Sequence, residues 1–230
     1  MGYSGERMSD YFASSNPLAS VVVASNNSGK LAEIRDMLSD LPLEWIRASD
    51  VTGGPWLVVE DGDTFEENAL LKARSACQAT GLIALADDSG LEVDALSGLP
   101  GVRSARFAHL NANDDENNAA LLEALQGVSD ADRTARFRCV LAVVTPYRHV
   151  PLLARGQCEG RIGWELKGQG GFGYDPLFCV NCFNNRSMAE LTSDEKSQVS
   201  HRGEAVRQLR PLLTELILNM TGQLDSVGGP

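Results

Sequence analysis

The feature that most limits the fold of this chain is a short apolar run that gives way to a polar turn and then to helical spacing. Residues 21–24 are all Val or Ala, which is typical of a buried strand, and the polar cluster 25–29 follows at once. Leu31, Ile34 and Leu38 then recur at the spacing of one helix face. A strand, a tight turn and a helix in this order indicate an α/β fold.

The chain continues this alternation and then changes to a hairpin. Residues 83–86 predict a second short buried strand, and residues 64–67 form the capping-box pattern that opens a helix. Residues 134–145 and 152–162 predict two strands that pair as a hairpin, and 203–217 predict a last helix. Because strands and helices alternate before the hairpin, we expect an α/β protein with a mixed sheet.

Length and composition place the chain among acidic globular proteins. It has 230 residues, and its 31 Asp and Glu against 20 Lys and Arg leave a net charge of −11. We expect one domain over residues 19–221, between a disordered leader at 1–18 and a polar tail at 222–230. A surface this acidic repels nucleic-acid backbones, so a nucleic-acid polymer is not an expected partner. A small anion can still bind where a few cations meet.

The sequence also indicates where the protein works. No apolar run approaches the ~20 residues of a membrane helix, and the N-terminus lacks the apolar segment of a secretory signal. Five cysteines, an odd number, suit a reducing compartment, so we expect a cytoplasmic protein with no membrane partner. Cys179 and Cys182 have C-x-x-C spacing, but no second pair or nearby histidine completes a zinc site, and we interpret them as core thiols.

Residues 25–30, Ser-Asn-Asn-Ser-Gly-Lys, lie between the first predicted strand and the helix after it. Free backbone N–H groups and the positive end of the helix dipole make such a turn suited to a phosphate, and Lys30 adds a formal charge. The turn is not a Walker A loop, because Ala24 stands where the first glycine is required and Leu31 where Ser or Thr is required. A polar N-cap on an ordinary helix is the alternative interpretation.

Residues 87–90, Asp-Asp-Ser-Gly, are expected at the carboxyl end of the predicted strand 83–86, where ligand clefts form in α/β sheets. Adjacent carboxylates repel each other and are favoured beside a cation. Mg²⁺ binds through one or two carboxylates together with substrate phosphates, so Asp87 and Asp88 indicate a magnesium site. Ser89 does not fit a hydrolase nucleophile, because Asp87 replaces a glycine of G-x-S-x-G. The alternative is a turn whose side chains cap a helix.

The glycine-rich stretch 168–176 carries groups suited to a planar ligand. Phe172 and Tyr174 offer flat faces for a base, and Asp175 can accept hydrogen bonds from ring N–H groups. A flexible loop with incidental aromatic residues is the alternative.

A cluster of hydrogen-bond donors precedes the last predicted helix. Lys196, His201 and Arg202 lie within seven positions of an otherwise acidic chain. Donors alone suit a carbonyl or a phosphate. The alternative is a solvated basic face.

In this order and spacing the clusters resemble the inosine triphosphate pyrophosphatase family, over residues 21–216. The stretches that carry the resemblance are residues 24–30, 67–73, 86–93, 98–106, 170–178 and 189–203. The bacterial branch is the more similar one, because of Asp87-Asp88-Ser89-Gly90 and Ser200-His201-Arg202-Gly203.

This resemblance implies two α/β lobes on an elongated mixed sheet with flanking helices, a nucleotide cleft between the lobes, and a homodimer. It also implies cleavage of a nucleoside triphosphate between its α- and β-phosphates, with ITP, dITP and XTP preferred over ATP and GTP. Mg²⁺ is the expected cofactor. The residues expected around the substrate are Ser25, Asn26, Asn27, Ser28, Gly29, Lys30, Lys72, Ser89, Phe172, Gly173, Tyr174, Asp175, Lys196, His201 and Arg202.

Each role has a physical basis. Asp88 would hold Mg²⁺ and orient or deprotonate the attacking water, with Glu60 as the second carboxylate at the metal. Residues 25–30, Lys72 and Lys196 would balance the phosphate charge. Phe172 would stack on the base while Asp175, His201 and Arg202 contact its edge. The 6-oxo group of hypoxanthine or xanthine accepts from these donors, whereas the 6-amino group of adenine leaves them unpaired at about 1–3 kcal/mol for each lost bond.

Two other hypotheses remain open at this point. One is a Maf-like nucleotide pyrophosphatase of different specificity, against which the motifs at 172–175 and 200–203 speak. The other is a regulator that binds nucleotides without turnover, against which the Asp87-Asp88 pair and Lys30 speak.

Overall fold

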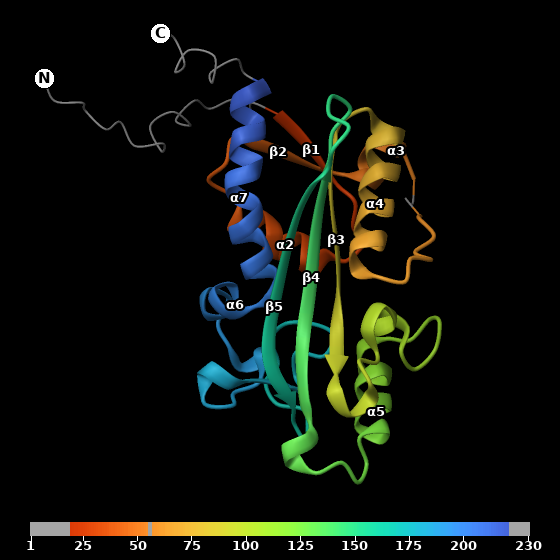
Figure 1. The fold of residues 1–230 in the computed structure, drawn as a ribbon, viewed down its shortest axis with the longest axis vertical. Helices are drawn as coiled ribbons and strands as arrows, with labels where there is room; N and C mark the ends of the chain where they lie inside the picture. Colours follow the sequence, from red (N-terminus) through yellow and green to blue (C-terminus); the bar gives the residue numbers. More distant parts are fainter. Residues whose placement is uncertain (1–18, 55–56, 221–230) are drawn as a thin grey trace, which may run out of the picture.

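In the computed structural model, residues 19–54 and 57–220 are described, and they form an α/β fold around one mixed sheet (Figure 1). The sheet has six strands in the order β2-β1-β3-β4-β5-β6. The strands are β1 (Ala19–Val23), β2 (Leu43–Arg47), β3 (Ile83–Val93), β4 (Thr134–Val144), β5 (Leu152–Ile162) and β6 (Phe178–Val180). β1 is parallel to β2 and β3, whereas each neighbouring pair from β3 to β6 is antiparallel. The predicted fold class, first strand and β4–β5 hairpin are confirmed.

Most of the helices begin next to a side chain that accepts a hydrogen bond from a free backbone N–H group. They are α2 (Ser28–Met37), α3 (Ala48–Thr52), α4 (Phe65–Thr80), α5 (Asp114–Ala124), α6 (Ser193–Val199) and α7 (His201–Met220). Thr64 and Glu67 form the predicted capping box at α4, and Thr192 and Glu195 form a second one at α6. None of the described helices is long and apolar enough to cross a bilayer. The proposed leader and tail lie outside the described residues.

Helices cover both faces of the sheet in the half that contains β1 and β2. Ala84 and Ala86 of β3 pack with apolar side chains of α4, whereas Leu85 packs with those of α2 and α7. This alternation follows from the two-residue period of a strand. The sheet therefore has an α4 face and an α2/α7 face, which lie on opposite sides in Figure 1.

A separate core covers the other end of the long strands. Leu91 of β3, Phe137 of β4 and Cys158 of β5 pack there with side chains of α5 and of the segment 174–191. Each of the three long strands thus contributes to packing at both ends of the molecule, which is elongated along these strands (Figure 1).

The prediction that the second strand ends at residue 86 is wrong. β3 continues to Val93, and Asp87 and Asp88 pair with Leu141 and Val140 of β4. Charged residues remain in this strand because cations from neighbouring helices reach them, as described below. β1, however, pairs with β3 only as far as Leu85. At residues 87–90, β3 therefore pairs with β4 on one side, and no strand among the described residues pairs with its other side. We call this unpaired side the open edge of β3.

We predict that Gly156→Ala destabilises the protein, because Gly156 of β5 lies directly against the start of α7. An added Cβ would lie 2.0 Å from the backbone oxygen of His201 and 2.5 Å from the nitrogen of Ala205. Backbone atoms cannot move aside cheaply, so we expect a loss of about 1–3 kcal/mol in the free energy of unfolding, measured by urea denaturation. Gly54→Ala is the control, since among the described residues beyond its chain neighbours no atom lies within 4 Å of its added Cβ. An unchanged midpoint for Gly156→Ala would contradict the close approach of α7.

Candidate active site

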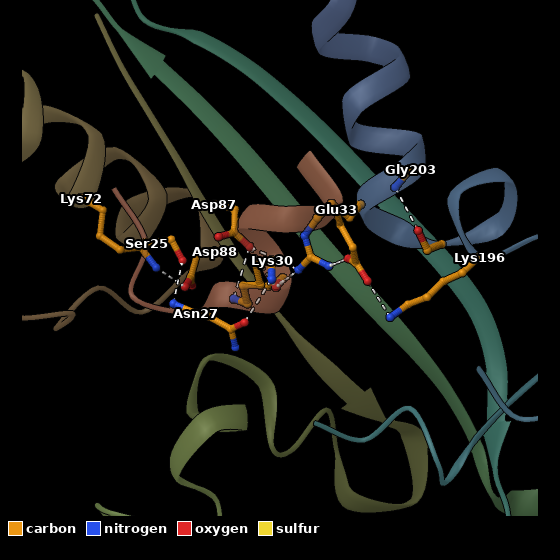
Figure 2. Close-up of polar contacts among 12 residues, drawn as sticks. Ser25, Asn27, Lys30, Glu33, Lys72, Asp87, Asp88, Lys196 and Gly203 are labelled. Atoms are coloured by element: carbon orange, nitrogen blue, oxygen red, sulfur yellow. Dashed lines mark hydrogen bonds and ion pairs between the residues drawn. The ribbon is translucent and has the colours of Figure 1, made fainter. Parts of the chain in front are cut away.

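A cleft lies where the open edge of β3 faces α2, α6, α7 and the glycine-rich loop at 168–173. Figure 2 shows the polar contacts beside it. Its lining includes most of the predicted substrate residues: Asn27, Lys30, Ser89, Phe172, Gly173, Tyr174, Asp175, Lys196, His201 and Arg202. Four clusters that are far apart in the sequence therefore meet in one place.

The turn at 25–30 is the capped N-terminus of α2. The Asn27 side chain accepts a hydrogen bond from the Lys30 nitrogen at 3.0 Å, and the Ser25 hydroxyl accepts one from the Asn27 nitrogen at 3.2 Å. The first turn of α2, which is described in full, holds no acidic side chain. The positive end of its dipole is thus not neutralised by its own residues, which suits an anion. The N-cap and phosphate interpretations of this turn are compatible.

The backbone of this turn also supports the aromatic side of the cleft. A Cβ on Gly29 would lie 2.6 Å from the ring of Phe172, so the glycine lets the ring rest against the turn. Asn26 of the turn has a negative φ angle, as most residues do. Among the described non-glycine residues, positive φ angles occur at Ser97, Asn184 and Asn185.

Asp88 projects from the α4 face of β3 toward a lysine. Lys72 of α4 places its Nζ 2.7 Å from Asp88 Oδ1 and 2.9 Å from Glu60 Oε2. Burial raises the pKa of Asp88 to about 6, and the charge of Lys72 opposes that rise. For Lys72, burial opposes the charged form, but Asp88, Asp87 and Glu60 outweigh it and raise its pKa. The structure thus brings the predicted residues Asp88, Glu60 and Lys72 together.

This arrangement fits a divalent ion. Asp88 and Glu60 both accept from Lys72 Nζ, so their oxygens converge on one point where a cation is bound. Oxygen-only ligands suit Mg²⁺, which commonly takes one or two carboxylates and completes its shell with water and phosphate oxygens. In the described part of the chain no three Asp, Glu, His or Cys side chains gather as a larger metal site.

Asp87 does not share this region, contrary to the expectation that the adjacent carboxylates meet one cation. It projects to the α2/α7 face, because neighbouring residues of a strand point in opposite directions. Its Oδ2 lies 3.2 Å from Lys30 Nζ and 3.3 Å from an Arg202 nitrogen. Burial disfavours its charge, but Lys30 and Arg202 outweigh that effect and hold the pKa of Asp87 well below its usual range.

Glu33 is a site residue that the sequence analysis missed. Its carboxylate lies 2.5 Å from Arg202 Nη1 and 2.6 Å from Lys196 Nζ, and Lys196 also lies 2.7 Å from Asp175. With Lys30 and Asp87, these residues form a chain of alternating charges along the cleft, part of which is visible in Figure 2. The one available signal was its position a turn after Lys30 on the same predicted helix face.

Arg202 and His201 differ from the solvent-exposed basic cluster that the alternative describes. Both are buried in the first turn of α7, and Arg202 also donates to the Ser89 hydroxyl at 3.0 Å. His201 stacks on Phe137 with ring centroids 4.7 Å apart. Burial and the charges of Arg202 and Lys196 lower its pKa well below the usual value, so the imidazole is neutral. His201 therefore offers one N–H donor and no positive charge.

The two aromatic residues of the glycine-rich loop have different environments, although the sequence suggested one role for both. Phe172 is half-buried, and Lys196 Nζ lies 4.7 Å from its ring centre. Tyr174 is only 4% exposed and donates its hydroxyl to the Ser104 carbonyl at 2.8 Å. It belongs to the core that lies beside α5 at the other end of the long strands. Tyr174 also lines the cleft, so its role toward a base stays a prediction, whereas its hydroxyl is engaged within the protein.

Asp175 is engaged within the protein. Its Oδ2 accepts hydrogen bonds from Lys196 Nζ at 2.7 Å and from the Phe172 nitrogen at 3.0 Å. Burial raises its pKa, and Lys196 opposes that rise. This oxygen therefore fixes the loop rather than facing a base. α5 holds the same loop through Asp114, which accepts from the Gly173 nitrogen at 2.6 Å.

The interpretation of Cys179 and Cys182 as core thiols is wrong for Cys182. Cys182 is exposed and Cys179 is partly buried, and both are free thiols. They lie at β6 and just after it, outside the lining of the cleft.

Comparison with known proteins decides the family. A family model described as the Ham1 family matches residues 21–212. The chain belongs to the Ham1 family. The dITP/XTP pyrophosphatase of Desulforamulus reducens is 47% identical over 199 residues, which cover 86% of this chain and 98% of that protein. The corresponding protein of Coxiella burnetii is 46% identical, with the same coverage of both chains.

Ham1 proteins of known structure have the same fold. The HAM1 protein from Coxiella burnetii has a TM-score of 0.77 at 46% identity, covering 86% of this chain and 99% of that one. The Staphylococcus aureus Ham1 protein has a TM-score of 0.76 at 39% identity, covering 85% and 98%. The resemblance stated from the sequence motifs is confirmed.

We predict that substitutions of the two loop aromatics in this Ham1 protein separate binding from stability. Phe172→Leu should weaken the affinity for a purine nucleotide by about 1–3 kcal/mol of lost stacking while leaving the thermal midpoint nearly unchanged. Tyr174→Phe removes one buried hydrogen bond and should cost about 1 kcal/mol of stability with affinity retained. Calorimetric titration and thermal unfolding of both variants test this. Unchanged affinity in Phe172→Leu would contradict the assignment of Phe172 as the stacking residue.

Proposed function

We propose that this protein hydrolyses the deaminated purine nucleoside triphosphates ITP, dITP and XTP to the monophosphate and pyrophosphate, and so removes them from the nucleotide pool. One observation carries the proposal. A helix N-terminus suited to phosphates, a carboxylate pair suited to a metal and an aromatic ring beside a guanidinium lie together at the open edge of β3. Membership of the Ham1 family and the dITP/XTP pyrophosphatase names of its relatives support the proposal.

The triphosphate would lie over the N-terminus of α2. Backbone N–H groups of residues 25–30 would bind phosphate oxygens there, aided by the helix dipole. Lys30 and Lys72 flank β3 on its two faces, so their ammonium groups approach this position from both sides. In a protein of net charge −11, these local cations account for the attraction of a polyanionic substrate.

Asp88 would act on the attacking water. Its carboxylate would orient a water molecule toward the α-phosphorus and accept a proton at a carboxylate oxygen. Asp88 and Glu60 would also hold Mg²⁺, which when bound neutralises phosphate charge and stabilises the pyrophosphate leaving group. Lys72 contacts both carboxylates and keeps them in place for this role.

The base would lie at the opposite end of the cleft, on Phe172. Arg202 and the neutral His201 supply buried N–H groups, and neither Arg202 Nε nor His201 Nδ1 has a hydrogen-bond partner within the described residues. A 6-oxo group can accept from such donors, whereas a 6-amino group cannot, which costs about 1–3 kcal/mol for each donor left unpaired. This difference favours hypoxanthine and xanthine over adenine.

We further propose a homodimer in the cytoplasm, as the family resemblance implies. Leu57, Val59 and Leu110 are exposed apolar side chains of the kind that a partner subunit covers. Sedimentation equilibrium tests this state, and a monomer at micromolar concentration would contradict it.

The activity is tested by measuring pyrophosphate release from ITP, XTP, GTP and ATP, each with Mg²⁺ and again with EDTA. We expect fast, metal-dependent release from ITP and XTP. Equal rates for all four bases would keep the phosphate chemistry but contradict the base recognition described here. ITP binding without release would indicate a nucleotide-binding regulator instead.

We predict that Asp88→Asn lowers kcat for ITP by about 10²–10⁴-fold, the usual contribution of a positioned general base. Nucleotide binding should persist, because the α2 turn and the base contacts are untouched. Steady-state kinetics together with calorimetric titration separate the two effects. Asp40→Asn is the control, since Asp40 forms an exposed ion pair with Arg210. Near-normal turnover of the Asp88 variant would remove Asp88 from the chemistry.

A further inference from the structure

Asp87 lies between the two ends of the cleft and contacts a cation from each. Lys30 comes from the first turn of α2, beside the phosphate turn, and Arg202 comes from the first turn of α7, beside Phe172. Both cations approach the same oxygen, Oδ2, at 3.2 and 3.3 Å. The other oxygen, Oδ1, is buried and has no hydrogen-bond partner within the described residues.

This carboxylate has little freedom to change partners. Asp87 is 2% exposed, so water cannot replace a cation that leaves it. Lys30 and Arg202 both contact this carboxylate and balance its charge. An ionised buried group is costly without a partner, and each of the two cations therefore constrains where the other can lie.

The position of Asp87 separates it from the proposed metal ligands. Asp88 and Glu60 meet Lys72 on the α4 face of the sheet, whereas Asp87 projects to the α2/α7 face. A role for Asp87 must therefore act through Lys30 and Arg202 rather than through the metal.

We propose that Asp87 is a positioning residue that couples recognition of the phosphates to recognition of the base. Its shared oxygen holds Lys30 and Arg202 in one joint arrangement, so a change at either end is transmitted to the other. The proposal rests on the proposed function for the assignment of the two ends. It goes further in making base selectivity depend on a residue that touches neither the base nor the phosphates.

The test uses binding alone, with EDTA present, so that it does not depend on turnover. Pyrophosphate reports on the phosphate end. The ratio of the dissociation constants of AMP and IMP reports on the base end, because the phosphate they share cancels in the ratio. We expect Asp87→Asn, which keeps the shape of the side chain and removes its charge, to weaken pyrophosphate binding and to lower the AMP/IMP ratio, each by about tenfold for about 1.4 kcal/mol.

Single-end variants provide the controls. Glu33→Gln changes a partner of Arg202 and Lys196, so it should lower the AMP/IMP ratio and, through Asp87, also change pyrophosphate binding. Lys30→Met should weaken pyrophosphate binding and, through Asp87, also shift the AMP/IMP ratio by at least threefold. The same Lys30 substitution made in the Asp87→Asn background should leave that ratio unchanged.

Each alternative has its own outcome. The coupling would be refuted if Asp87→Asn weakened only pyrophosphate binding or lowered only the AMP/IMP ratio. It would also be refuted if Lys30→Met still shifted the AMP/IMP ratio in the Asp87→Asn background. A weaker affinity for Mn²⁺, measured by electron paramagnetic resonance, with an unchanged ratio would make Asp87 a metal ligand. If Asp87→Asn does not fold, Lys30→Met alone decides, since an unchanged ratio there refutes the proposal. Failure of wild-type protein to release pyrophosphate from ITP would refute the proposed function and leave these binding results interpretable.

Discussion

The site depends on an elementary property of a β-strand, that neighbouring side chains leave it on opposite faces. β3 carries two adjacent aspartates past the point where its parallel neighbour ends. Asp88 therefore meets α4 and its lysine, whereas Asp87 meets α2 and α7. Two carboxylates that would repel each other in a turn are kept apart by the strand, and each acquires its own cations.

The second constraint is the placement of charge in an acidic protein. The cations of the cleft are each paired with a carboxylate of the protein itself, in the chain that runs from Lys30 through Arg202 to Asp175. Buried ion pairs of this kind are weak sources of stability, because desolvation offsets much of their attraction. Their value lies in holding donors ready for a ligand. A nucleotide carries the same kinds of acceptor, phosphate and carbonyl oxygens, and can take over part of these contacts.

Local patterns in the sequence predicted the elements whose signals are local. Apolar runs and capping residues located β1, α4 and the hairpin, because burial and N–H satisfaction leave a regular trace. The continuation of β3 was missed because its aspartates are stabilised by residues far away in the chain. Glu33 was missed for the same reason, since its partner Arg202 lies 169 positions further on. Phe172 and Tyr174 look equivalent in the sequence, and only the packed structure shows that one of them belongs to the core.

The three long strands have a mechanical consequence. β3, β4 and β5 run without interruption from the core under α4 and α7 to the core beside α5. The cleft lies between these halves, yet the sheet that joins them contains no flexible linker about which one half could swing. The width of the cleft therefore depends on how far the three strands bend and twist together. The separation of the two cores is thus set by the sheet itself rather than by a hinge.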